Sequence, residues 1–467
     1  MPKLYNTPGV YVEEISASLP VIHPAETAIP AFIGRTEFNN HQDNANNIAT
    51  KPIKISSFTD YERYFGNASS EHLIFSVSII DTQTETFNRQ LELDVDEKSV
   101  SGAYMYYALQ MFFGNGGNSC YIASSGDYSS SFDDSCGQAC LDAVAQIDEV
   151  TMIVFTDKHI NKSETSSGYK YLNDLALSQC YRLKDRIAIF NSWVDSTKPI
   201  NDLKIMRNDV SSENLKYGCM YYPWLQSTLK YEYDEHKIYI KHLLNDNSGA
   251  FEGKSLAELK ESELYSLIKD ELSKCTIDLP PAAAIAGVMA KMDRDRGVWK
   301  APANVAVNQI KLPCVTLTNN EQDLFNIDVD AGKSVNIIKF FAGKGTLVWG
   351  ARTLAGNDNE WRYIPVRRFF NFVEDSIKKG IESFVFEPND ANSWVRIKTI
   401  CENFLIQLWR NGALQGIKPE HAFYIKIGLG ETMTARDILE GKMIVEIGLA
   451  PVRTAEFIIM RMELKVN

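Results

Sequence analysis

The sequence has 467 residues, of which 45% are hydrophobic and 23% charged, and its formal net charge is −12. This composition excludes a mainly disordered chain, and the length allows roughly three domains at about 150 residues each. The acidic balance argues against a nucleic-acid-binding protein, because phosphate binding depends on clustered Lys and Arg. No apolar run approaches the ~20 residues that cross a bilayer, and the first residues lack the basic and apolar regions of a secretory signal. We therefore expect a folded protein that is made in the cytoplasm and does not insert into a membrane.

The N-terminal stretch NTPGVYVEEI (6–15) predicts a turn followed by a strand without an evident partner. Pro8 and Gly9 favour the turn, and Val10, Tyr11 and Val12 favour extended backbone. The spacer behind them is rich in Pro and small residues and is poorly suited to a tight hairpin. The local pattern leaves three interpretations open: a frayed terminus, an edge strand of the same domain, or a strand held away from it.

The next hundred residues predict a short buried strand at 28–34, then a strand and a helical turn within 53–66 that Thr59 can cap. Residues 67–100 mix apolar alternation with acidic sequence, which predicts a strand pair or an excursion from the main fold. Apolar residues recur at helical spacing in GAYMYYALQMFF (102–113), and the glycines that follow stop this helix.

From there the chain alternates between helices and strands rich in Ile, Val and Phe. The expected helices lie near 139–147 and 168–183, and the expected strands at 120–122, 151–155, 186–190 and 220–225. This alternation predicts a largely parallel sheet covered on both faces. Residues 226–279 break the rhythm and are interpreted as a peripheral insertion that contains an amphipathic helix.

A helix of small residues, AAAIAGVMAKMDRD (282–295), is expected to return to the core and to pack tightly against other backbone. In the last third, one helix aligns Val366, Phe369, Phe370, Val373 and Ile377 on a single face. A second helix aligns Ile397, Cys401, Phe404 and Leu408 and ends at Asn411-Gly412. Strands are expected at 383–386, in FYIKIG (423–428), in MIVEIGL (443–449) and in EFIIMRMELKV (456–466).

Motifs that carry chemistry are missing from this chain. The eight cysteines are scattered, and Cys136 and Cys140 have no second Cys or His pair nearby to complete a zinc site. Gly253-Lys254-Ser255 and Gly332-Lys333-Ser334 resemble the end of a phosphate-binding loop but lack its spacing. None of the seven histidines lies in a nucleophile-elbow or triad signature. The sequence therefore favours a protein that is not an enzyme and that holds no cofactor or metal.

Several motifs together closely resemble contractile phage tail sheath proteins. They are TPGVYVEEI (7–15), FFGNGGNSCYI (112–122), GVMAKMDRDRGVWKAPAN (287–304), FAGKGTLVWGARTL (341–354), WRYIPVRRFFNFVEDSIKKGI (361–381), FVFEPNDANSWVRI (384–397) and GLAPVRTAEFIIMRMEL (448–464). The resemblance touches both ends and most of the chain after residue 100. Residues 67–100 and 226–279 match no family motif, which suits outer, variable insertions.

The resemblance implies an α/β fold with a subtilisin-like parallel-sheet core that lacks catalytic residues, an α+β C-terminal sheath domain, variable insertions and extended terminal arms. The implied domains are an N-terminal arm and linker (1–24), an N-terminal sheath region (25–100), the subtilisin-like domain (101–352) with its insertion at 226–279, a C-terminal sheath domain facing an inner tube (353–455), and a C-terminal strand arm (456–467).

The resemblance also implies the function of a structural subunit. Copies of the chain would stack as hexameric rings around an inner tube and contract from a metastable extended state. The implied partners are further copies of the chain, the inner tube protein, and baseplate and terminal cap proteins, with no nucleic acid. The particle would be a phage tail, a released injection particle or a cell-anchored machine. The alternative from the inferred sheet alone is a subtilisin-like or other α/β hydrolase.

Period-2 alternation at both termini fits arms that add strands to neighbouring subunits. The expected arm residues are Val10, Tyr11, Val12, Glu13, Glu14 and Ile15 at one end, and Phe457, Ile458, Ile459, Met460, Arg461, Met462 and Leu464 at the other. Ser16, Ala17, Ser18, Leu19 and Pro20 form the expected hinge linker. Lys378 and Lys379 are candidates for contact with the inner tube, although cations also suit the C-terminal end of an exposed helix.

Overall fold

The computed structural model describes residues 21–38, 51–70, 75–83, 87–95, 101–163, 166–193, 198–211, 213–245 and 247–457. The chain forms two compact units. The smaller unit comprises Met1–Pro24 with Asp375–Pro451, and the larger comprises Ala25–Glu374 with Val452–Asn467. The division falls within helix α9 (Ile364–Ile381).

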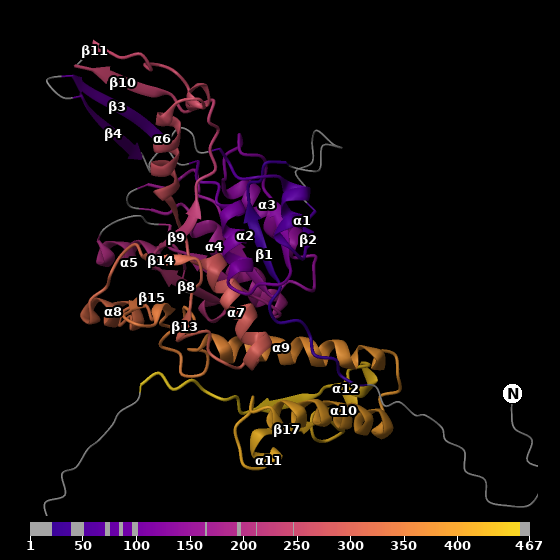
Figure 1. The fold of residues 1–467 in the computed structure, drawn as a ribbon. Coiled ribbons are helices and arrows are strands. Elements are labelled where there is room, and N and C mark those ends of the chain that lie inside the picture. Colours follow the sequence, from indigo (N-terminus) through magenta and orange to yellow (C-terminus); the bar gives the residue numbers. More distant parts are fainter. Residues whose placement is uncertain are drawn as a thin grey trace, which may run out of the picture. The chain divides into compact units, whose positions relative to one another are not determined.

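The larger unit is built on a nine-stranded sheet (Figure 1). Its strand order is β13-β16-β15-β8-β7-β6-β1-β5-β2, and the six strands from β15 to β5 run parallel. The bounds are β1 Pro30–Gly34, β2 Ile53–Ile55, β5 Cys120–Ser124, β6 Met152–Phe155, β7 Ile187–Asn191, β8 Gly218–Tyr222, β13 Val305–Ala306, β15 Asn336–Phe341 and β16 Gly345–Val348. The predicted, largely parallel sheet is confirmed.

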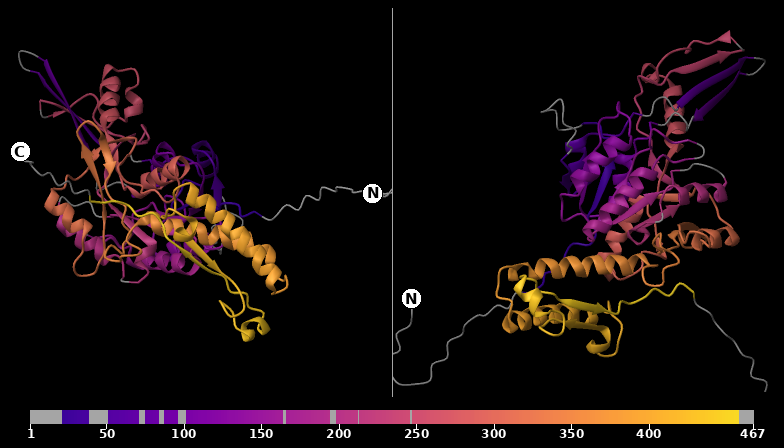
Figure 2. Two further views of the ribbon diagram at one scale, coloured as in Figure 1. Left: turned by 90° about the horizontal axis from the view of Figure 1, so that it is seen from below. Right: turned by 180° about the vertical axis from the view of Figure 1, so that it is seen from behind.

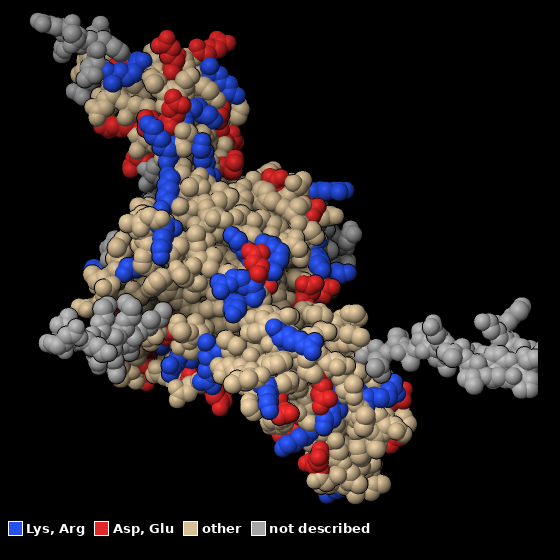
Figure 3. All heavy atoms as spheres, turned by 60° about the horizontal axis from the view of Figure 1, so that its bottom comes forward, with Lys and Arg blue, Asp and Glu red and all other residues tan. Residues whose placement is uncertain are grey.

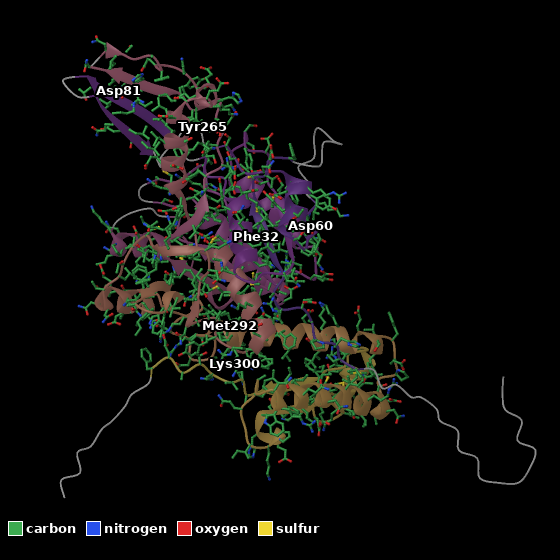
Figure 4. The ribbon with its side chains drawn as sticks, in the orientation of Figure 1. Phe32, Asp60, Asp81, Tyr265, Met292 and Lys300 are labelled. Atoms are coloured by element: carbon green, nitrogen blue, oxygen red, sulfur yellow. The ribbon has the colours of Figure 1, made fainter. Side chains whose placement is uncertain are left out.

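Both faces of this sheet are covered. Phe32, labelled in Figure 4, and its neighbours Ala31 and Ile33 in β1 are all fully buried. Successive side chains of a strand point to opposite faces, so both faces of the sheet are covered at β1. One helix pair on the sheet is α2 (Met105–Gly114) with α7 (Ala282–Arg296), and the other is α3 (Asp134–Val144) with α4 (Lys170–Leu183). The predicted close packing of the small-residue helix is confirmed, because a Cβ on Gly287 would meet the carbonyl oxygen of Phe112 at 2.4 Å.

Two segments that match no family motif meet in a second sheet. Its order is β11-β10-β3-β4, with β3 at Phe75–Gln83, β4 at Phe87–Val95, β10 at Ile240–Leu244 and β11 at Asn247–Ser248 (Figure 1). Helix α6 (Glu263–Lys274) packs on β4. Buried Asp81 links three of the four strands, since it accepts two hydrogen bonds from Arg89 of β4 and lies 3.0 Å from Nε2 of His242 in β10.

Further elements complete the larger unit. A three-stranded sheet has the order β12-β9-β14, with β9 at Leu225–Lys230, β12 at Thr276–Leu279 and β14 at Ile310–Pro313. The remaining α-helices are α1 (Phe58–Phe65), α5 (Pro199–Asn208) and α8 (Asn319–Asn326). Residues 226–279 therefore contribute strands to two sheets.

The smaller unit contains α10 (Ala391–Arg410), α11 (Pro419–Ala422), α12 (Ala435–Leu439) and the antiparallel pair β17 (Phe423–Lys426) and β18 (Glu446–Leu449). The predicted buried face of α10 is confirmed, and β17 packs against this helix (Figure 2). Ile22 packs here too, because a Cβ on Gly380 would lie 2.5 Å from its side chain.

Three predicted local features are wrong. Helix α1 is capped by Ser57, whose backbone is extended and whose Oγ accepts the Asp60 N–H at 3.1 Å, and not by Thr59. The predicted helix near 139–147 begins earlier, at Asp134, because Asp133 forms a capping box with Cys136. The predicted strand 383–386 is a 3₁₀ turn, η5 (Glu382–Phe384), followed by an exposed loop, because two local backbone hydrogen bonds close the connection between α9 and α10.

Candidate assembly sites

The carboxyl edge of the parallel sheet is the usual place for a ligand in an open α/β fold. Here a buried ion pair occupies it: Nε of Arg35, after β1, donates to Oδ2 of Asp157, after β6, at 2.8 Å. Burial raises the pKa of the Asp157 carboxyl, although Arg35 opposes the shift. Beside them the hydroxyls of Thr36 and Ser124 lie 2.7 Å apart. The polar groups at this edge are therefore hydrogen-bonded to one another and connect strands β1, β5 and β6.

The two buried histidines of the described residues are held by backbone groups. Nδ1 of His242 accepts the Phe251 N–H at 3.1 Å, so its proton is on Nε2, which faces Asp81. Nδ1 of His159 likewise accepts the Asn161 N–H at 3.1 Å. Neither arrangement provides a base beside a nucleophile. Within the described residues, no group of three or more His, Cys, Asp or Glu side chains could hold a metal ion.

The carboxylate of Glu456 anchors the beginning of the C-terminal strand segment that the sequence predicts at 456–466. Glu456 accepts hydrogen bonds from Nε and Nη2 of Arg352 at 3.0 and 2.6 Å, from Nδ2 of Asn326 at 3.0 Å and from the Tyr363 hydroxyl at 3.1 Å. The side chains of Arg352 and Glu456 are 4% and 22% exposed. Burial works against ionisation of Glu456, but the hydrogen bonds from Arg352 and Asn326 hold its pKa below the usual value.

Arg352, the ion-pair partner of Glu456, is held in place by the nine-stranded sheet. Asn336 of β15 pairs with the Arg352 backbone in both directions, accepting its N–H at 2.7 Å and donating to its carbonyl at 2.7 Å. A cavity of about 520 Å³ lies beside the anchor, lined by residues that include Trp349, Tyr363 and the segment 454–457. The structure therefore holds the first residues of the predicted C-terminal strand in a preformed site.

The smaller unit contains a two-stranded antiparallel sheet, formed by β17 and β18. Over Phe423–Lys426 and Glu446–Leu449, β17 and β18 pair only with each other among the described residues. Unpaired N–H and C=O groups along the outer edges of a sheet are templates for further strands, and a sheet of two strands gains stability from added ones.

Comparison with known proteins gives a consistent result. The family profile described as "Phage tail sheath C-terminal domain" matches residues 356–465. The tail sheath protein of Enterobacteria phage T4 is 28% identical over 143 residues, 30% of this chain and 20% of that protein. That of Burkholderia phage BcepMu is 26% identical over 144 residues, 30% of each chain. The chain thus aligns with only a fifth to a third of the length of these relatives.

Two structural matches extend over the whole length. The sheath of an extracellular contractile injection system, PVC, in its contracted state is 28% identical, covers 100% of this chain and 99% of its own, and has a TM-score of 0.63. The contracted helical sheath of the anti-feeding prophage is 28% identical over 98% and 99% of the two chains, with a TM-score of 0.64. Over nearly its whole length, this chain is therefore similar to the sheath proteins of contractile tails and injection systems.

The relatives and structural neighbours are structural sheath proteins, not enzymes. A cluster of charged residues, DRDR (293–296), lies at the end of α7. Asp293 of the DRDR run is buried and accepts two hydrogen bonds from Arg368, and Arg368 also donates to the carbonyl of Thr27. Motifs far apart in the sequence of this chain therefore bind one another.

The predicted site residues fall into two groups. Those of the N-terminal arm, Val10–Ile15, of the hinge linker, Ser16–Pro20, and of the C-terminal arm from Ile458 onward lie outside the described residues. The others are described. Phe457 is 68% exposed at the cavity, and Lys378 and Lys379 lie in the last turn of α9, where Lys379 pairs with Asp375 at 2.7 Å. No described helix is long and apolar enough to cross a membrane.

The anchor of the C-terminal segment was missed by sequence reasoning. Arg352 and Glu456 both lie inside motifs that carried the resemblance, GARTL and TAEF. The only signal was the presence of opposite charges within apolar sequence, and such charges pair in space only after the chain has folded.

Proposed function

We propose that the chain is the structural sheath subunit of a contractile injection system, a phage tail or a related tail-like particle. The observation that carries this proposal is the match, over nearly the full length of both chains, to sheath proteins of two such systems in their contracted state. A further match, to the baseplate of the anti-feeding prophage, is 28% identical over 99% and 100% of the two chains, with a TM-score of 0.65, and suggests baseplate proteins as partners.

In this function the copies form stacked hexameric rings around an inner tube, with baseplate and terminal cap proteins at the ends. The extended lattice is metastable, and contraction to a lower-energy lattice drives the tube through a target envelope. New subunit contacts supply the energy, so no nucleotide is needed. The particle is a virion, a released extracellular particle or a cell-anchored machine.

Strand exchange would hold the rings together. The outer edges of β17 and β18 are suitable acceptors for the arm residues Val10–Ile15 and Phe457–Leu464 of neighbouring copies. Main-chain hydrogen bonds would give affinity, and alternating side chains would set the register. The Glu456 anchor supports this proposal, because it fixes the point from which the C-terminal arm leaves its own subunit. The hinge linker would bend while the added strands stay paired.

The remaining assignments follow from the resemblance. The parallel sheet would be the subtilisin-like core without catalytic residues, residues 353–455 would face the inner tube, and the segments 67–100 and 226–279 would be outer insertions. Lys378 and Lys379 would contact the tube through polar interactions, which release more readily than a large apolar interface. Lys379 is already paired with Asp375, so Lys378 is the better candidate of the two.

The alternative of an α/β hydrolase finds no support. The relatives are sheath proteins, and the sheet edge that would hold a catalytic group carries the bonded pair of Arg35 and Asp157. Negative-stain electron microscopy of the expressed full chain tests the proposal. Hollow cylinders of stacked rings are the expected result, whereas compact monomers at every concentration would overturn it.

A further inference from the structure

Two cations of the larger unit share the same two aromatic rings. The guanidinium carbon of Arg367, in α9, lies 4.3 Å from the centre of the Trp361 ring and 4.9 Å from that of Tyr217. Nζ of Lys216 lies 4.7 and 5.7 Å from the same two rings. Cation–π attraction stabilises each charge, but it does not neutralise either of them.

The carboxylates around these cations are already engaged. Glu374 accepts a hydrogen bond from Nη2 of Arg367 at 3.0 Å, and Oδ1 of Asp358 accepts the backbone N–H groups of Glu360 and Trp361. In the described part of the chain Lys216 forms no ion pair of its own, although the charges of Asp358 and Glu374 reach it. Among the described residues, the direct contacts of the Lys216 ammonium group are therefore with the two rings, and both nearby carboxylates are hydrogen-bonded to other groups.

The surroundings of Lys216 disfavour its charge in the isolated subunit. Partial burial, followed by repulsion from Arg367, lowers the pKa of Lys216, although the carboxylates of Asp358 and Glu374 oppose the shift. A second carboxylate placed between the two cations would reverse both effects, because it would neutralise the repulsion and replace the lost hydration by a charge-assisted hydrogen bond. Arg367 is fixed by its bonds to Asn371 and Glu374, so Lys216 is the group left to make the direct contact.

We propose that Lys216, with Arg367, Tyr217 and Trp361, forms a carboxylate-binding site that receives an Asp or Glu side chain from a neighbouring copy of this chain. The inference rests on the proposed sheath function, since it needs a polymer of identical subunits. The chain itself offers the ligand: it has 60 acidic against 48 basic residues, and acidic side chains are spread over the face drawn in Figure 3. The same net charge of −12 disfavours a polyanion such as nucleic acid as the occupant.

Zero-length carbodiimide crosslinking tests this site directly, because the reagent joins an amine to a carboxylate only when the two are in contact. Full-length chain with natural isotopes is mixed with ¹⁵N-labelled chain, polymerised, crosslinked and analysed by peptide mass spectrometry. The expected product is a mixed-isotope peptide that joins Lys216 to an Asp or Glu of another copy. It should be absent from dilute protomers.

Variants provide the second measurement. Lys216→Gln should raise the concentration needed for polymerisation about tenfold, as expected for the loss of one charge-assisted hydrogen bond, and Lys216→Arg should restore it. Lys204→Gln, at an exposed lysine of α5, is the matched control and should have no effect. Thermal unfolding of each protomer verifies that the variants are folded.

The outcomes separate the inference from the proposed function. If the wild type polymerises but Lys216 crosslinks only within its own copy, and Lys216→Gln polymerises normally, the carboxylate site is refuted and the sheath function stands. If the wild type forms no polymer under any condition, both are refuted.

Discussion

The anchor of the C-terminal segment can be broken by a single substitution. Glu456→Ala removes the carboxylate that accepts hydrogen bonds from Arg352, Asn326 and Tyr363. Arg352 is only 4% exposed, so in the docked state of the variant its charge would be left without a partner. Breaking a buried pair by removing one partner costs about 3–5 kcal/mol. We take the lower end, about 3 kcal/mol, because the segment can leave its site and let Arg352 be hydrated.

A loss of about 3 kcal/mol raises the population of the detached segment by a factor of about 100. Trypsin cleavage after Arg453 reports this population, since the Arg453 side chain must first leave the carbonyl of Asn359, to which it donates a hydrogen bond at 3.1 Å. When closing is fast relative to cleavage, the cleavage rate follows the open population. We therefore expect cleavage at Arg453 in the protomer to accelerate about 100-fold.

Two further variants control this experiment. Arg352→Met breaks the same pair without changing the cleaved sequence and should accelerate cleavage similarly, and the double variant should show much less than the product of the single effects. Glu446→Ala, at an exposed residue of β18, should leave the rate unchanged. Rates within twofold of the wild type for both single variants would show that Glu456 does not hold the segment.

Four other predictions follow. The pKa of Glu456 is lowered in the folded state, so the stabilisation by its carboxylate is present above the usual pKa of 4.5 and is lost as the pH falls through the folded-state pKa. Cleavage at Arg453 by an acid-tolerant trypsin variant should therefore become faster only below about pH 4.5. In guanidinium denaturation, Asp293→Asn should lower the free energy of unfolding by about 3 kcal/mol, because it breaks a buried pair. Lys379→Ala removes an exposed lysine from its pair with Asp375 and should change this free energy by about 0.5 kcal/mol or less. Deletion of residues 1–20 should leave a folded protomer that sediments as a monomer, and normal polymers would refute the arm hypothesis. A few flexible residues inserted into the hinge linker should permit assembly but block contraction in particles triggered under the microscope, whereas wild-type contraction would refute the hinge assignment.

The fold could be predicted from the sequence wherever the spacing of apolar residues indicates which side of a helix or strand is buried. The all-apolar strand Ala31–Ile33 and the aligned face of α10 with Ile397 and Phe404 were both evident, because local pattern alone decides which side of an element is buried. The pairing of β3 with β10 could not be predicted. Asp81 and His242 are 161 residues apart, and each strand alone has several possible partners.

The candidate site was less predictable, because charge in a sequence does not reveal burial. Asp293 lies in a run that is typical of a solvated helix end, yet it is buried against Arg368. Glu456 lies at the start of a predicted strand, and only the folded sheet brings Arg352 to it. The same applies to Lys216, because one of its two aromatic neighbours, Trp361, lies far away in the sequence.

The most direct test is a cryo-EM reconstruction of the polymer formed by the full chain. A helical sheath is expected, in which strands from neighbouring copies extend the sheet of β17 and β18 and the chain leaves its own subunit at Glu456. Polymers in which both edges of this sheet stay open, or in which each arm folds back onto its own subunit, would contradict strand exchange as the basis of the sheath.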